Sequence, residues 1–215
     1  MSIIRTLALP AAFLLAFVSN AQVVSEAAAK TIRTSKAEVV SFAISPKGDR
    51  LLVGLNKGAE LYDLESGKKI FAFPYNEDGS TAVYRVGFNE NGEYLLLIGH
   101  SGKRNVWDAK TGKQEKILKD HTWIPDPRAV KAMGLDMSNS AFDRFYQQSE
   151  IMVNGTTVRA AKNGAVEFVG ADAKVARTIT FPENKDQHHR APLLLHDGQL
   201  LIGTDTGAVL FYTLL

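Results

Sequence analysis

The side chains best suited to chemistry or recognition in this 215-residue sequence are its five histidines and two tryptophans. Adjacent His188 and His189 in "QHHR" have diverging side chains, and no close carboxylate spacing accompanies them as a metal site requires. Trp123, between His121 and two prolines in "HTWIPDP", suits a rigid aromatic anchor for a partner. Because no G-x-S-x-G, H-E-x-x-H or phosphate-binding glycine motif is present, we expect no catalytic residue, metal or cofactor.

Composition narrows the classes of protein that this sequence can encode. The formal net charge is +2, from 25 basic and 23 acidic residues, and no block of like charge suggests a nucleic-acid partner. The absence of cysteine excludes disulfides, thiolate metal sites and cysteine nucleophiles. The length and a hydrophobic content of 45% suit one folded domain with a processed leader.

Residues 1–21 read as a secretory signal peptide. "MSIIR" places a positive charge before the apolar run "TLALPAAFLLAFV", and the small and polar residues "SNAQ" follow. We expect cleavage after Ala21, with a weaker second site at Ala27 and Ala29. An uncleaved anchor is the alternative, but the run contains a proline and is shorter than the ~20 residues of a spanning helix. The sequence therefore predicts a secreted or periplasmic protein without a stable membrane anchor after cleavage.

The chain contains four related units. The segment "FAISPKGDRLLVGLNKGAELYDLESGKKIFAF" aligns with "VGFNENGEYLLLIGHSGKRNVWDAKTGKQEKIL", and "EIMVNGTTVRAAKNGAVEFV" aligns with "LLLHDGQLLIGTDTGAVLFY". The first turn glycines of the units are Gly48, Gly92, Gly155 and Gly198. Short apolar runs rich in Val, Ile, Leu, Phe and Tyr alternate with glycine turns, which predicts a four-stranded antiparallel meander in each unit. In the first unit we expect strands at Val39–Ser45, Leu51–Leu55, Ala59–Leu64 and Lys69–Phe73.

One meander cannot bury both of its faces, so neighbouring units must stack, and stacking around an axis makes a β-propeller. The segments "VWDAKTGK" and "LYDLESGK" resemble the end of a WD-repeat blade, over residues 38–118 in detail and 150–215 by pattern. The resemblance implies that Trp107 and Tyr62 pack between blades, and that Asp108 and Asp63 tie a strand to its turn. Gly99-His100 lies at a different position from the family's Gly-His pair, so the family's buried His-Asp network is not expected.

The expected fold is an all-β propeller of about four WD-like four-stranded blades with an insertion between blades 2 and 3. The expected bounds are blade 1 at 38–73, blade 2 at 82–118, the insertion at 119–149, blade 3 at 150–181 and blade 4 at 191–215, within a domain of residues 30–215. Because the last unit ends after its third strand, we expect "KTIRT", Lys30–Thr34, to complete it. Two alternatives stay open: a homodimer forming an eight-bladed ring, and an incomplete relative of a larger propeller.

The resemblance implies that inter-blade loops share one binding face with the turns between second and third strands. The candidate binding residues on that upper face are Tyr75, His100, His121, Trp123, His188, His189 and Arg190. The plainer interpretation is that polar residues gather in loops in any protein. We expect an exported, non-enzymatic scaffold that binds a protein or another ligand. The alternative is a lactonase-like or quinoprotein-like propeller that uses its axial channel and loop histidines.

Overall fold

The computed structural model describes residues 22–77, 79–99, 103–115, 150–161, 164–181 and 190–215. The predicted signal peptide and the predicted insertion lie outside these residues. Every regular element in the described part is a β-strand, and none of it forms a helix long and apolar enough to cross a membrane.

The strands form four antiparallel sheets that match the four units of the sequence. Blade 1 contains β2 (Val39–Ile44), β3 (Arg50–Leu55), β4 (Gly58–Asp63) and β5 (Lys69–Phe73). Blade 2 contains β6 (Val83–Phe88), β7 (Tyr94–Gly99) and β8 (Arg104–Asp108). Blade 3 contains β9 (Glu150–Val153), β10 (Thr156–Ala160), β11 (Val166–Val169) and β12 (Val175–Ile179). Blade 4 contains β13 (Leu193–His196), β14 (Gln199–Gly203), β15 (Ala208–Thr213) and β1 (Lys30–Arg33).

Blade 2 differs from the expected four strands, because its described part has three. The chain nevertheless turns back beside β8: Trp107 forms an isolated bridge with Gln114, and the Glu115 amide donates to the carbonyl oxygen of Val106 at 2.8 Å. These contacts begin a fourth strand, and the remainder of the predicted strand, residues 116–118, lies outside the described residues.

The hairpin turns carry glycines where the sequence predicted them. Gly48, Gly92, Gly155 and Gly198 have φ values of 72°, 74°, 77° and 69°. An L-residue with a side chain rarely adopts such angles, so glycine supplies these turns at no steric cost. The repeat of turn glycines in the sequence therefore reflects a repeat of backbone geometry.

The prediction that an N-terminal strand completes blade 4 is confirmed. β1 pairs with β15 in antiparallel register, from Lys30 opposite Phe211 to Arg33 opposite Ala208. Ile32, which is 2% exposed, packs into the core between blades 4 and 1. Lys30 Nζ also donates to the carbonyl oxygens of Leu64 and Glu65, which lie in the turn after β4 of blade 1. The closing strand thus fastens blade 4 to blade 1.

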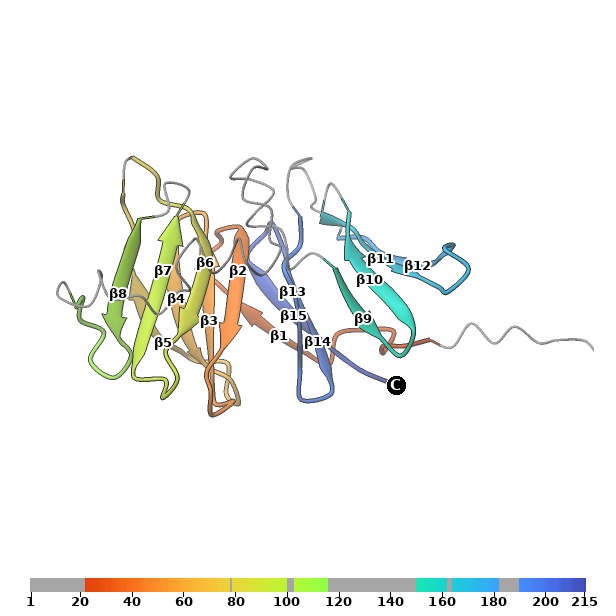
Figure 1. The fold of residues 1–215 in the computed structure, drawn as a ribbon, viewed down its shortest axis with the longest axis horizontal. Coiled ribbons are helices and arrows are strands. Elements are labelled where there is room, and N and C mark those ends of the chain that lie inside the picture. Colours follow the sequence, from red (N-terminus) through yellow and green to blue (C-terminus); the bar gives the residue numbers. More distant parts are fainter. Residues whose placement is uncertain (1–21, 78, 100–102, 116–149, 162–163, 182–189) are drawn as a thin grey trace, which may run out of the picture.

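The four blades follow one another in the order 2, 1, 4, 3 along the longest axis of the molecule (Figure 1). The first strands of successive blades are in contact, β6 with β2, β2 with β13, and β13 with β9. A hydrophobic core fills each of these three junctions. Blades 2 and 3 lie at opposite ends of Figure 1, so the described residues form an open arc of propeller-type blades.

Candidate binding face and the Glu60 cluster

One edge of the arc carries the inter-blade loops together with the turns between second and third strands. In the described residues, this upper face includes residues 34–38 between β1 and β2, 56–57 between β3 and β4, 74–77 and 79–82 between β5 and β6, and 204–207 between β14 and β15. The antiparallel registers place these segments together, since Leu55 at the end of β3 pairs with both Val39 and Gly58. The sequence-based grouping of these loops on one face follows from this register.

Backbone hydrogen bonds join the loops of the upper face around the junction of blades 1 and 2. The Gly58 amide donates to Thr81 O at 2.8 Å, and Thr81 Oγ1 donates to Asn56 O at 2.9 Å. The Asn56 amide in turn donates to Glu38 O at 3.1 Å. Each of these loops is therefore held in place by a hydrogen bond to a neighbouring loop, in addition to the strands that it connects.

The same chain of bonds continues across the junction of blades 4 and 1. The Val39 amide donates to Thr204 O at 2.9 Å, and the Thr34 amide donates to Gly207 O at 2.9 Å. We call residues 34–39, 56–58, 80–82 and 204–207 the linked rim. Its members come from three blades, and Lys36, Lys57 and Thr206 are exposed on it.

Below the linked rim, the second strands of blades 1, 2 and 4 carry a glycine at or next to their last position, where a neighbouring segment comes close. A Cβ on Gly54 would lie 2.3 Å from Ser41 Oγ and 2.5 Å from Val83 O of blade 2. A Cβ on Gly99 would lie 2.5 Å from the Tyr75 ring, and one on Gly203 would lie 2.6 Å from Pro192 and Val39. These approaches explain why glycine, rather than a larger apolar residue, ends β7 and β14 and stands one residue before the end of β3.

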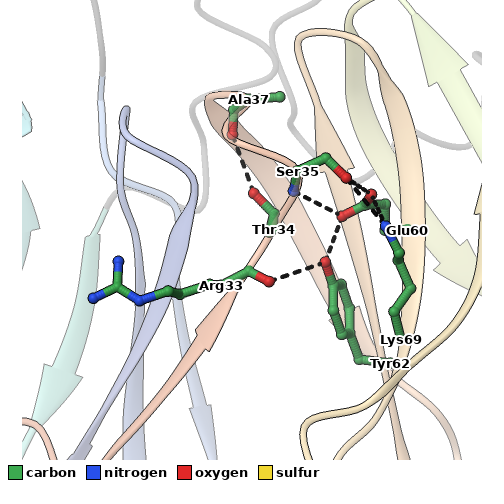
Figure 2. Close-up of polar contacts among 7 residues, drawn as sticks. All are labelled: Arg33, Thr34, Ser35, Ala37, Glu60, Tyr62 and Lys69. Carbon is green, nitrogen blue, oxygen red and sulfur yellow. Dashed lines mark hydrogen bonds and ion pairs between the residues drawn. The ribbon is translucent and has the colours of Figure 1, made fainter.

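A buried polar cluster lies between the linked rim and the junction of blades 4 and 1 (Figure 2). Glu60 on β4 is 4% exposed. One carboxylate oxygen accepts hydrogen bonds from the hydroxyl of Tyr62 and, at 3.3 Å, from the Ser35 amide. The other accepts from the Ser35 hydroxyl and, at 2.9 Å, from Lys69 Nζ. The Tyr62 hydroxyl also lies 3.4 Å from Arg33 O.

These contacts determine the ionisation of the cluster. Burial by itself would raise the pKa of Glu60, but hydrogen bonds from Ser35, Tyr62 and Lys69 and the charge of Lys69 together hold it below its ordinary value. Burial, followed by the hydrogen bond to Glu60, raises the pKa of the Tyr62 hydroxyl. The stable state is thus a Glu60 carboxylate facing a neutral tyrosine and a charged lysine. Because Arg33 and Ser35 belong to the closing strand and its loop, this charge fixes that strand on blade 1.

In both repeats of the motif, the aspartate accepts hydrogen bonds from the turn that follows its strand. Asp63 Oδ1 accepts from the Ser66 amide at 2.7 Å and from the Ser66 hydroxyl, and Asp108 Oδ1 accepts from the amides of Lys110 and Thr111 at 2.8 and 2.7 Å. The Ser66 contacts lower the pKa of Asp63, and the Thr111 amide is the largest cause of the lowered pKa of Asp108.

The aromatic residues before these aspartates pack between blades. Tyr62 is 2% exposed in the core between blades 4 and 1. Trp107 is 8% exposed in the core between blades 1 and 2, and its ring centroid lies 5.3 Å from that of Phe73. The two repeats of the motif therefore hold two successive junctions.

Tyr75 is a correction to the expected binding residues. Its side chain is 3% exposed, its hydroxyl donates to Lys103 O at 2.9 Å, and it accepts from the Gly99 amide at 2.9 Å. Tyr75 thus ties the loop after β5 to the β7–β8 turn and does not present its ring to a partner. The prediction failed because the sequence does not show that Gly99 leaves room for this ring.

The other expected contact residues are placed only in part. Arg190 precedes blade 4 and is half-buried. His100, His121, Trp123, His188 and His189 lie outside the described residues. His196 ends β13 on the opposite edge, where its ring lies near Gly48 of blade 1. In the part of the chain that the structure describes, no three His, Asp or Glu side chains gather in a way that could hold a metal ion.

The Glu60 cluster was missed by the sequence reasoning, although a signal was present. In "GAELYD" a charged residue interrupts an apolar strand, and a buried carboxylate needs partners. Tyr62, two residues further on the same face, and Lys69 on the next strand supply two of them. Ser35 could not be found in this way because its proximity depends on the pairing of β1 with β15.

No family model matches the chain. Autophagy-related protein 18 of Saccharomyces cerevisiae, in strains YJM789 and S288c, is 26% identical over 115 residues, covering 47% of this chain and 23% of the relative. The chain therefore spans about a quarter of the curated relatives that it matches.

Two similar solved structures are those titled "Structure of U3-55K" and "Crystal structure of RRP9 WD40 repeats". Both are 10% identical, with TM-scores of 0.37 and 0.38. They cover 84% and 83% of this chain, and the chain covers 54% and 52% of them. With its repeat, its blade topology and its closing strand, the chain resembles the WD-repeat β-propellers.

Proposed function

We propose that this protein is an exported binding module that holds a protein partner on its upper face. The observation that carries the proposal is the linked rim, in which loops from three blades are joined to one another by hydrogen bonds. Loops that are already ordered lose little conformational entropy when a partner binds. Binding residues are also commonly found on loops that a rigid scaffold of strands holds in position.

The charge on the linked rim indicates the chemistry of the contact. Lys36 and Lys57 are exposed on neighbouring loops of the linked rim, which also carries the half-buried Glu38 and Asp205. These charges of both signs favour a partner that offers oppositely charged groups at matching positions, since opposite charges steer encounter and fix register. Export is supported by the leader-like residues 1–21, whose apolar run is followed by small residues.

Site-specific photocrosslinking in the cells that make the protein tests the binding face. A photoreactive residue replaces Lys57 on the upper face, and a matched variant carries it at Lys47. Lys47 is equally exposed but lies in the β2–β3 turn on the opposite edge of blade 1. The proposal expects a protein adduct from position 57 and much less from position 47. Equal adducts from both positions, or an adduct from position 47 alone, would contradict it.

A further inference from the structure

The first described residues extend the closing strand of blade 4 beyond β1. The Ser25 amide donates to Thr213 O at 2.8 Å, the Leu215 amide donates to Val23 O at 3.1 Å, and Val24 forms a bridge with Leu214. Val23 and Val24 are 8% and 0% exposed and belong to the core between blades 3 and 4. Among the described residues, Val23 is thus the first that belongs to the core, and Gln22 before it is exposed.

Arg177, on β12 at the outer side of blade 3, holds this segment from the neighbouring blade. Its Nη1 donates to the carbonyl oxygens of Val24 and Ser25, both at 3.1 Å. Its Nη2 donates to Ser25 O at 3.2 Å and to Glu26 O at 2.9 Å. The guanidinium lies over the Phe168 ring, 5.4 Å from its centroid. The planar guanidinium group can donate to several acceptors at once. We call this set of contacts the Arg177 clamp.

The clamp reinforces a junction that has few other strand contacts. Blade 1 contacts blade 2 through β2 and β3, both against β6, whereas the main strand contact between blades 3 and 4 is β9 against β13. Val23 and Val24 supply apolar surface to this junction, and Arg177 ties their backbone to β12.

We propose that residues Val23–Glu26 and the Arg177 clamp form a permanent staple between blades 3 and 4, so that a mature chain beginning at Gln22 keeps the complete fold and one beginning at Lys30 does not. This inference rests on the proposed export and decides between the two cleavage sites that the sequence leaves open. A chain cut after Ala29 would keep β1 but lose both core valines and every acceptor of the clamp. It would leave four guanidinium hydrogen bonds unmade at a partly buried site, which is costly. A cut after Ala21 removes no residue of the staple.

Intact-mass analysis of protein exported from a secreting host tests the start of the mature chain. The expected mass corresponds to residues 22–215. A folded exported protein that begins at Lys30 would overturn the inference. An exported protein that retains residues 1–21 would contradict the cut at Gln22, and failure to find the protein outside the cells would contradict the proposed export; in either case the next two experiments decide on the staple alone.

Two recombinant chains, beginning at Gln22 and at Lys30, separate the staple from export. Because the shorter chain lacks two buried valines and the clamp, we expect its melting temperature to be lower by at least about 5 °C. Equal melting temperatures for the two chains would show that the segment is dispensable and would overturn the staple.

Substitution of Arg177 tests the clamp in the chain that begins at Gln22. Arg177→Gln should lower the melting temperature by about 3–8 °C, and hydrogen exchange should become faster at the Ser25 and Leu215 amides. The matched control is Arg159→Gln on the same blade, whose guanidinium forms an exposed ion pair with Glu167. Unchanged exchange at both amides in Arg177→Gln, or an equal effect of Arg159→Gln, would contradict the clamp.

Discussion

Glu60 is the residue whose charge contributes most clearly to the fold, because it joins the closing strand to blade 1. Its pKa is lower in the folded protein than its ordinary value of 4.5. A lowered carboxyl pKa contributes stability that is fully present above the unfolded pKa and is lost as the pH falls through the folded pKa. We therefore expect the free energy of unfolding to fall as the solution is acidified below about pH 5.

Glu60→Gln should remove this acid-sensitive contribution and cost about 1–3 kcal/mol at neutral pH. Denaturant unfolding at several pH values measures both effects. The control is Glu65→Gln, an exposed residue of the same blade, which should leave stability within about 0.5 kcal/mol. Asp63 and Asp108 also have lowered pKa values, so some acid sensitivity should remain. An undiminished pH dependence in Glu60→Gln would refute the role given to its charge.

Gly54 offers a prediction about close approach between blades 1 and 2. Gly54→Ala would bring a Cβ against Ser41 Oγ and the Val83 carbonyl, so we expect a loss of about 1–3 kcal/mol in the free energy of unfolding. Gly87→Ala is the matched control in β6, because its Cβ would meet nothing within 4 Å. Urea midpoints should fall for the first variant and stay level or rise for the second. A lower urea midpoint for Gly87→Ala than for Gly54→Ala would contradict the close approach of blade 2 to Gly54.

The contacts of single residues were the feature that the sequence predicted least well. The turn glycines were predicted correctly, since a positive φ depends on local turn chemistry. Tyr75 was assigned to the surface and Glu60 was missed, because both depend on contacts between segments far apart in the sequence. The assignments of His100, Trp123 and the remaining loop histidines stay predictions.

The closing strand is the element on which the arc depends. Ile32→Ala should lower the free energy of unfolding by about 2–4 kcal/mol, because its side chain is 2% exposed in the core between blades 4 and 1. Thr31→Ala, an exposed neighbour on the same strand, should change it by less than about 0.5 kcal/mol. Thermal or chemical unfolding of the two variants checks this. Similar stabilities for both would indicate that β1 does not pack as described.

Elements were predicted better than residues because hydrophobic periodicity and turn chemistry are local. The expected strands of blade 1 agree with β2–β5 to within one residue at each end. The pairing of β1 with β15 was found by counting strands in each unit, which is a property of the repeat. The extension of that strand back to Val23 was not found, since "VVSEAAAK" carries no strand signal and its pairing comes from β15.

At the scale of the whole molecule, the ends of the arc decide how copies could assemble. An eight-bladed ring of two chains would press the outer face of blade 3 against the outer face of blade 2. On blade 3, Val158 and Phe168 face blade 4, so alternation turns Arg159 and Glu167 outward, where they form an ion pair at 2.7 Å. Burying that pair costs desolvation energy. We therefore predict a monomer by light scattering; a stable dimer would contradict this.

The open arc itself could not be predicted from the sequence. The repeat gives the number of blades and the order of strands, but the angle between blades depends on the volume of the three junction cores. The close approaches at Gly54 and Gly203 set part of that angle, and each involves a residue of another blade or of the loop before it.

Strands β1 and β15, from opposite ends of the described chain, build one blade, and an engineered disulfide between them is a direct test of this pairing. Thr31 and Leu210 are opposite residues of β1 and β15, and the chain has no cysteine of its own. In Thr31→Cys with Leu210→Cys, opposite Cα atoms lie within disulfide range. We expect a nearly complete cross-link in the folded protein, found by peptide mapping, and none for Thr31→Cys with Thr157→Cys on blade 3. A folded protein whose first pair stays reduced under oxidising conditions would contradict the claim.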